Sequence, residues 1–167
     1  MATLVKRKEI MLYYNTTPGQ ETKTWKLYGK KTVSCSYDYN PSSTSETYIT
    51  DDNATTILDA YAVSIPGDMK CYYGDAVFDY INKLRYDLAV GSDAEGEVLL
   101  IDRYIKVGQD TNAFQAEVFK STTMINNYGG DGGQIASITF TTSLNGDPEK
   151  GSVTFVGEEP TFTQTVV

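Results

Sequence analysis

The chain has 167 residues, of which 40% are hydrophobic, and a net charge of −8. This length predicts one domain with a sizeable core, and the acidic balance argues against a nucleic-acid-binding surface, because phosphate binding needs clustered Lys and Arg. The absence of histidine removes the commonest general base and most catalytic zinc sites, and two cysteines, Cys35 and Cys71, are too few for a disulfide framework or a structural zinc site.

The first 31 residues are basic, with seven basic and two acidic residues and a net charge of +5, whereas the other 136 residues carry −13. Residues 1–9 are weakly patterned, and we interpret them as an N-terminal arm in which Lys6, Arg7 and Lys8 form a basic cluster. The charge split suits head-to-tail association, in which a basic end meets an acidic body, and it equally suits an exposed basic edge strand.

No apolar run is long enough to cross a bilayer, and residues 1–9 lack the apolar segment of a secretory signal. We therefore expect the chain to mature where it is made. A single domain is expected over residues 10–156, with a polar C-terminal tail at 157–167.

The domain is expected to begin with a short strand at 10–14. From Trp25 the sequence alternates as a strand does, with Val33, Cys35, Tyr37 and Tyr39 on one side. A long polar loop at 39–54 follows, and the next strand is expected at 57–65.

One segment, at about 75–88, has a helical period. Its apolar residues recur at helical spacing and predict a face that packs on a sheet: Val77, Phe78, Ile81, Leu84 and Leu88. Asp75 at the start and Gly91 beyond the end agree with helix capping preferences.

Two further strands are expected at 98–107 and 113–125, where the apolar alternation shifts at Phe119 and suggests a bulge. A glycine-rich tip at 128–133 precedes a segment at 134–155 that reads as a β-hairpin. Its first strand alternates from Ala136 to Leu144, and Asn145-Gly146-Asp147-Pro148 is expected to reverse the chain before a return strand with Val153 and Phe155.

No segment carries a catalytic constellation. The glycine-rich tip precedes a strand and not a helix, so it is not a phosphate loop, and Asp51-Asp52-Asn53 lacks the full ligand spacing of an EF-hand. We expect no enzyme activity, no metal and no cofactor. Thirteen tyrosines suggest protein interfaces or, as the competing interpretation, a sugar-binding platform.

Several segments occur in the order seen in one family: Trp-Lys-Leu-Tyr-Gly at 25–29, Ser-Tyr-Asp-Tyr-Asn-Pro at 36–41, Tyr-Ile-Thr-Asp-Asp-Asn at 48–53, the helix, and Gly-Asp-Pro-Glu-Lys-Gly-Ser-Val-Thr-Phe at 146–155. Together they resemble the tail-tube (major tail) proteins of tailed bacteriophages, particularly those of long non-contractile (siphophage) tails.

The resemblance implies a mainly β, tail-tube-like sandwich or barrel with one flanking helix. It also implies six copies in a ring and rings stacked into a tube that conducts DNA. The loop at 39–54 and the arms at 1–8 and 156–167 are expected to bridge subunits and rings. The expected contact residues are Lys6, Arg7 and Lys8 between rings, and Tyr37, Tyr39, Asn40, Pro41, Tyr48, Ile49, Asp51 and Asp52 between subunits.

The same resemblance implies a virion protein that is synthesised in the host cytoplasm and has no membrane anchor. Its expected partners are further copies of itself, the tape measure protein and the tail terminator or initiator proteins, while DNA passes without specific binding. Two alternatives stay open: a carbohydrate-binding or virion-decoration β-sandwich, and the tube protein of a contractile injection system.

Overall fold

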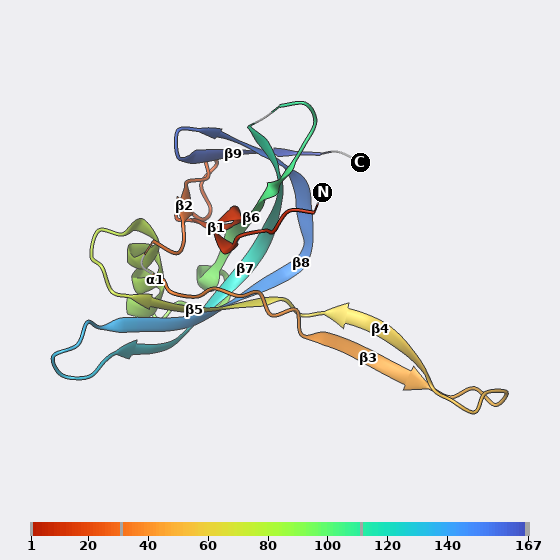
Figure 1. Cartoon of the computed structure of the whole chain (residues 1–167). Helices are drawn as coiled ribbons and strands as arrows, with labels where there is room; N and C mark the ends of the chain where they lie inside the picture. Colours follow the sequence, from red (N-terminus) through yellow and green to blue (C-terminus); the bar gives the residue numbers. More distant parts are fainter. Residues whose placement is uncertain (1, 31, 111, 166–167) are drawn as a thin grey trace.

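The computed structural model describes residues 2–30, 32–110 and 112–165, and these are mainly β-strand with one α-helix (Figure 1). The elements in chain order are η1 (Arg7–Glu9), β1 (Ile10–Asn15), β2 (Trp25–Leu27), β3 (Pro41–Glu46), β4 (Thr55–Tyr61), β5 (Ser64–Lys70), α1 (Ala76–Tyr86), η2 (Gly91–Ala94), β6 (Glu95–Lys106), β7 (Ala113–Gly129), β8 (Ser137–Val156) and β9 (Glu159–Gln164). None of the described helices is long and apolar enough to span a membrane.

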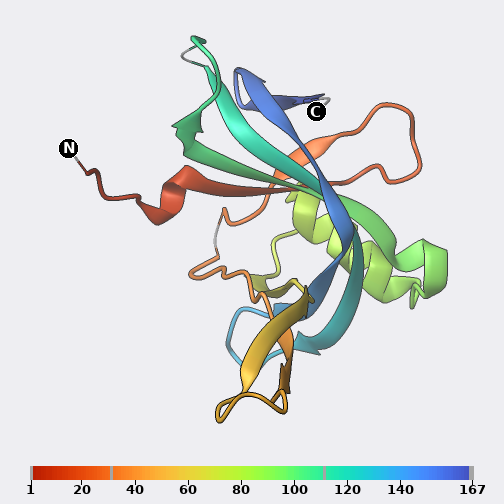
Figure 2. The ribbon, with the colours of Figure 1, turned by 90° about the vertical axis from the view of Figure 1, so that its right-hand side faces the viewer.

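Seven strands form one antiparallel sheet in the order β2-β1-β6-β7-β8-β5, and β9 also pairs with β8. The sheet curls so strongly that β9 approaches β2, where Lys26 Nζ lies 3.5 Å from Glu159 Oε1 (Figure 2). This part of the sheet is a nearly closed barrel, and β3 and β4 form a separate hairpin outside it.

Both faces of the sheet are buried, each over a different part. One apolar cluster fills the curled part and includes Tyr13, Trp25 and Leu99. The other cluster lies on the opposite face under α1 and includes Tyr14 and Val98. Adjacent residues of β1 and β6 thus enter different cores, because successive strand residues point to opposite faces.

This change of face also explains the predicted shift at Phe119. Val118 belongs to the cluster in the curled part, and Phe119 belongs to the cluster under α1, so β7 keeps its alternation and only the covered side changes. The pairing of β7 with β8 does shift beside Phe119, between Val118 and Lys120. The extra residues lie on β8, which advances four positions from Asn145 to Glu149 while β7 advances two.

The predicted hairpin turn at 145–148 is therefore wrong. β8 runs as one 20-residue strand through this segment and pairs with β7 on both sides of it. Gly146 has φ +68°, so the turn-forming residues produce a bulge that bends the strand. The chain reverses instead at the predicted glycine-rich tip, between β7 and β8, and again around Gly157, between β8 and β9.

Three other predictions also need correction. The predicted strand at 57–65 is split, because β4 pairs with β3 outside the sheet and β5 pairs with β8 within it. The alternating segment at 33–39 forms no strand, and only an isolated bridge joins Asp38 to Ser64. Residues 159–164 of the predicted C-terminal tail form β9, which covers an edge of β8.

The predicted helix is confirmed in type and in most of its buried face. Asp75 Oδ1 accepts hydrogen bonds from the backbone nitrogens of Val77 (3.1 Å) and Phe78 (3.0 Å), which caps the helix. Val77, Phe78, Ile81 and Leu84 are buried as predicted. Leu88 is the exception, because α1 ends at Tyr86 and turns at Leu88, whose side chain is 81% exposed.

Candidate assembly surface

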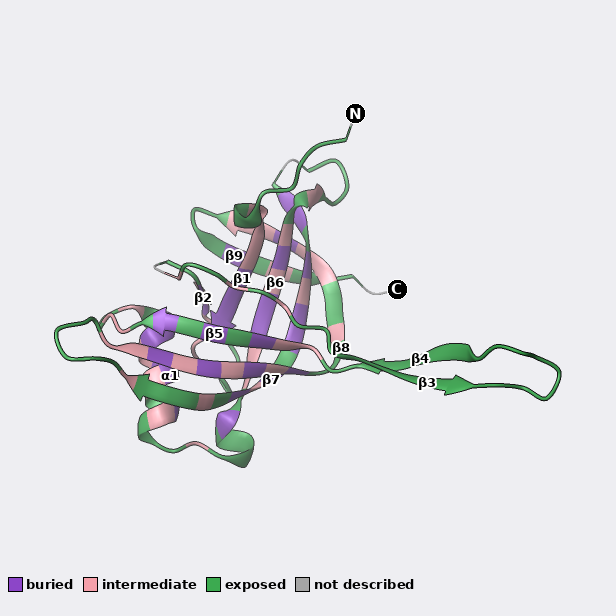
Figure 3. Cartoon of the chain, turned by 60° about the horizontal axis from the view of Figure 1, so that its bottom comes forward, coloured by how far each residue is buried: buried purple, intermediate pink, exposed green. Residues whose placement is uncertain are grey.

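The most prominent feature outside the core is the β3–β4 hairpin, here called the arm (residues 41–61), which projects from the body of the molecule (Figures 1 and 3). Every residue of both strands is exposed. Side chains also pair across the hairpin, since Thr44 Oγ1 donates to Asp59 Oδ2 at 2.7 Å and Ser45 and Thr56 hydroxyls lie 3.0 Å apart. A lone two-stranded hairpin of this kind is marginally stable in water.

Asn40 holds the arm at its root. The residue adopts a positive φ of 42°, and its Nδ2 donates to the carbonyl oxygens of Ala62 (3.0 Å) and Asp38 (3.2 Å) and to Ser64 Oγ (3.2 Å). The rings of Tyr39 and Tyr61 meet edge to face beside it, with centroids 6.0 Å apart. These contacts set the direction in which the arm leaves the sheet.

The surface of the arm and its root combines apolar and acidic side chains. The exposed apolar residues are Tyr39, Tyr48, Ile49, Ile57, Leu58 and Tyr61, and the acids are Glu46, Asp51, Asp52 and Asp59. No Lys or Arg occurs anywhere between Lys31 and Lys70 in the sequence. The arm therefore presents apolar side chains together with acidic ones and no basic ones. Exposed apolar patches with a polar rim are typical of interaction sites.

Most of the predicted subunit-contact residues are brought together here. Tyr39 and Asn40 lie at the root, Pro41 starts β3, and the segment from 47 to 54 forms the tip with Tyr48, Ile49, Asp51 and Asp52. Their role in contacts stays a prediction. Sequence reasoning missed Ile57, Leu58 and Tyr61, because an apolar run before a buried strand reads as part of that strand.

Tyr37 is placed elsewhere. Its ring is half-buried against the core under α1, and the Arg7 guanidinium lies 6.0 Å from the ring centroid. Burial raises the pKa of Tyr37, and the nearby Asp102 charge raises the pKa of Tyr104. The pKa values of both phenols are thus shifted further above neutral pH, whereas an acid–base catalyst needs a pKa near the operating pH.

The basic N-terminal segment extends from the body (Figure 2), and its three predicted contact residues differ in their surroundings. Arg7 is engaged within the chain, because its Nε donates to the Cys35 carbonyl at 3.1 Å and its Nη1 donates to the Ile10 carbonyl. Lys6 and Lys8 are exposed, and neither forms an ion pair within the described part of the chain. These two lysines are thus the free charges of the segment.

Two strand edges of the sheet are also open among the described residues. Beyond Thr122, β7 pairs only with β8, because β6 begins opposite that residue. The outer edge of β5 carries only the Asp38–Ser64 bridge. Open edges present unpaired backbone groups, which another chain can pair with.

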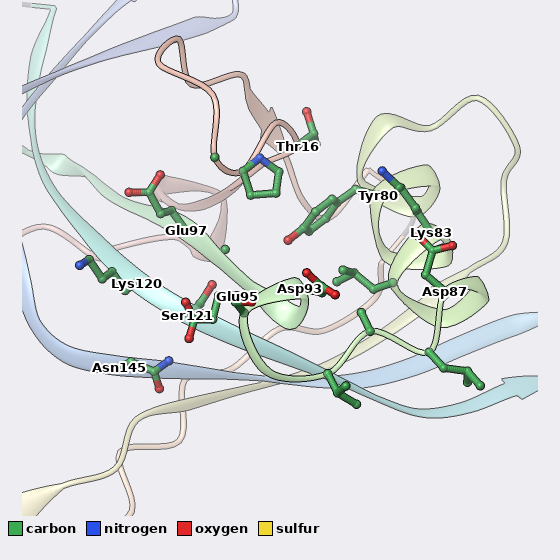
Figure 4. Close-up of a pocket in the computed structure, with 18 residues that line it drawn as sticks. Thr16, Tyr80, Lys83, Asp87, Asp93, Glu95, Glu97, Lys120, Ser121 and Asn145 are labelled. Carbon is green, nitrogen blue, oxygen red and sulfur yellow. The ribbon is translucent and has the colours of Figure 1, made fainter.

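A cavity of about 930 Å³ lies between α1, the start of β6 and the loop after β1 (Figure 4). Its charges are mixed, with Lys83 and Lys120 against four acids, and Glu97 is already bound by Lys23 Nζ at 2.7 Å. Gly96 leaves room for Tyr80, since a Cβ there would lie 2.6 Å from the Tyr80 hydroxyl. Among the described residues, no group of three or more His, Cys, Asp or Glu side chains is placed to hold a metal ion.

No protein-family model matches the chain, and no curated protein matches it. Its fold is similar to that of a chain in the tail of an empty GTA particle with C6 symmetry, at a TM-score of 0.58 and 13% identity, over 87% of this chain and 97% of that one. A chain of the PVC sheath–tube complex, an extracellular contractile injection system in its extended state, aligns at a TM-score of 0.48 and 10% identity, over 91% and 93%. The first similarity confirms the mainly β, tail-tube-like fold.

Proposed function

We propose that this chain, which has a tail-tube fold, is a structural virion subunit that assembles into hexameric rings stacked as a phage tail tube. The observation that carries the proposal is the arm, an exposed acidic and apolar hairpin. It projects from a body whose fold is similar to that of a chain in the GTA particle tail. A monomer gains nothing from such a hairpin, whereas an assembly gains a contact.

The open strand edges support ring formation. In a ring, the edge of β5 in one copy would pair with the edge of β7 beyond Thr122 in the next, so neither of these two edges would stay exposed. Closed point-group symmetry is the common solution for identical subunits, and the C6 symmetry of the GTA tail provides a precedent for six.

The net charge of −8 supports a conduit through which DNA slides, because carboxylates repel phosphates and offer them no binding site. The proposed partners are further copies of the chain, a tape measure protein and tail terminator or initiator proteins. The proposed location is the virion tail after synthesis in the bacterial cytoplasm. Catalysis and cofactors have no part in this function.

Electron microscopy of the purified chain at low and high concentration, with sedimentation in parallel, tests the proposal. We expect six-fold rings or long hollow tubes whose abundance rises with concentration. A monomer at every concentration that binds glycans in an array would overturn the proposal in favour of a carbohydrate-binding module, which the exposed tyrosines of the arm and its root favour.

The free lysines of the N-terminal segment allow a charge test of ring stacking. We expect Lys6→Glu with Lys8→Glu to shorten tubes and to reduce their sensitivity to salt, because an attraction to acidic surfaces of the next ring is removed. Tube length is measured by microscopy between about 0.05 and 0.5 M NaCl. Over this range the electrostatic screening length falls from above about 10 Å to below it.

The matched control is Lys106→Glu with Lys150→Glu, which makes the same charge change at two other exposed lysines. Arg7 is left unchanged because it holds the segment to the Cys35 and Ile10 carbonyls. If both pairs of substitutions had equal effects, net charge alone would explain the result, and the stacking role of Lys6 and Lys8 would be dropped.

A further inference from the structure

A shallow apolar groove of about 530 Å³ lies where α1 ends, between the loop that follows the helix, η2 and β7. Leu84, Leu88, Val90, Met124 and Ile125 are among the side chains that line it. Arg85 is the one charged residue among the described residues of the lining. The groove adjoins the part of β7 that lacks a second strand partner. The apolar side chains of the groove and the neighbouring backbone edge of β7 are therefore both open to another chain.

Leu88 is the unusual residue of this groove. It has a φ of +47°, in the left-handed region that glycine and asparagine favour at the end of a helix. The backbone there closes α1, because Ala89 N donates to the Leu84 carbonyl at 3.0 Å and Leu88 N to the Arg85 carbonyl at 3.2 Å. Leucine is thus a poor choice for the turn and adds nothing to the core.

Leu88, Val90 and Met124 form one exposed apolar patch. The side chains of Val90 and Met124 are 77% and 49% exposed, and both border the groove. Strain at an exposed residue and apolar side chains gathered around a hollow are both features of sites that serve an interaction outside the chain.

We propose that the groove receives the tip of the arm of a second copy, with Ile49 seated against Leu88. This inference rests on the proposed assembly and names the surface that the arm contacts. Ile49 is fully exposed at the tip, next to Tyr48, and has no apolar neighbour in the core clusters of its own chain. The groove volume of about 530 Å³ is large enough for the side chains of Ile49 and Tyr48 together.

Charge and geometry favour this occupant. Asp51 and Asp52 follow Ile49 on a tip without cations, and the charged residue of the groove is Arg85. The Arg85 guanidinium lies 4.2 Å from the Tyr128 ring centroid and its Nε donates to Asn82 Oδ1 at 2.8 Å, so its positive charge is held at the groove. The arm and α1 lie on opposite sides of the body, so the arm points away from the groove of its own chain (Figures 1 and 3). A contact between opposite sides of identical copies is heterologous, and its repetition builds a ring or a filament.

The first test is Leu88→Gly. The substitution removes the side chain and relieves the left-handed turn, so we expect the thermal midpoint of the monomer to hold or rise while the concentration needed for assembly increases about tenfold or more. Leu88→Asn, which also tolerates this backbone, should behave alike, and Tyr73→Ser, which removes an exposed aromatic ring elsewhere, should leave assembly unchanged. Normal assembly of both Leu88 variants would overturn the proposal.

The second test mixes two full-length variants, Ile49→Cys and Leu88→Cys, under mild oxidation and maps disulfides by mass spectrometry. We expect a link between residues 49 and 88 in the mixture and not in either variant alone. Rings or tubes without this link would overturn the groove contact and leave the proposed function standing. A 49–88 link in short head-to-tail chains that never form tubes would support the contact and overturn the tube. The absence of both link and assembly, at concentrations well over about tenfold above the one at which the unsubstituted chain assembles, would overturn both.

Discussion

A chain without the arm is expected to fold normally and to form no rings or tubes. In this variant residues 41–61 are replaced by Asn-Gly, a two-residue turn, because Asn40 and Ala62 already lie together at the root of the arm. Since every strand residue of the arm is exposed, its removal takes nothing from either apolar core. Sedimentation and microscopy measure assembly, and circular dichroism with a thermal scan measures folding.

A narrower deletion separates the tip from the strands. Replacing only residues 47–54 with a short turn leaves β3 and β4 but removes Ile49 and the two acids beside it. If the tip makes the contact, this variant should lose assembly to the same extent as the chain without the arm. Tubes formed by the chain without any arm would contradict the proposed function of the hairpin.

Phe140→Ala is expected to lower the free energy of unfolding by about 3–5 kcal/mol, a large part of the 5–15 kcal/mol typical of a domain. Phe140 is 1% exposed and packs between the rings of Tyr14 and Tyr28, with centroids 6.4 and 6.0 Å away. The ring also covers Gly67 of β5, its direct partner across the sheet. Urea unfolding at pH 7 measures the loss.

Gly67→Ala supplies a second measurement at the same contact. A Cβ at Gly67 would lie 2.3 Å from Phe140 Cζ, so we expect this substitution alone to destabilise the chain as well. In the double variant the new methyl group occupies space that the ring has left, so the combined loss should be smaller than the sum. Additive losses would contradict this packing account, and Ile135→Ala, at an exposed residue, should change the free energy of unfolding little.

The elements that could be predicted from the sequence are those whose signal lies within a single segment. The helix over Val77 to Leu84 follows from apolar spacing, and its start follows from the capping carboxylate of Asp75. The burial of Ile138, Phe140 and Thr142 follows from strict alternation. The exposed tip with Tyr48 and Ile49 follows from a polar segment that interrupts the strands, although its partner does not.

The turn residues at 145–148 show where local signals fail. Asn-Gly and Asp-Pro permit a reversal, but whether the chain reverses depends on a partner strand, and β7 pairs with β8 on both sides of these residues. The free energy of those backbone hydrogen bonds comes from a distant segment, which local propensity does not contain. The same reasoning applies to residues 159–164, which read as a polar tail and become a strand because β8 offers an edge.

By itself, the sequence of this protein determined its class, its helix and the residues that alternate into a core, because these follow from the period and chemistry of neighbouring side chains. Only the tertiary structure decided that the predicted strand at 57–65 divides between arm and sheet, that Arg7 is held by Cys35 and Tyr37, and that Leu88 faces outward. The physical reason is that burial and strand pairing are properties of two segments at once, and each of these residues meets its partner, or lacks one, only when the chain has folded.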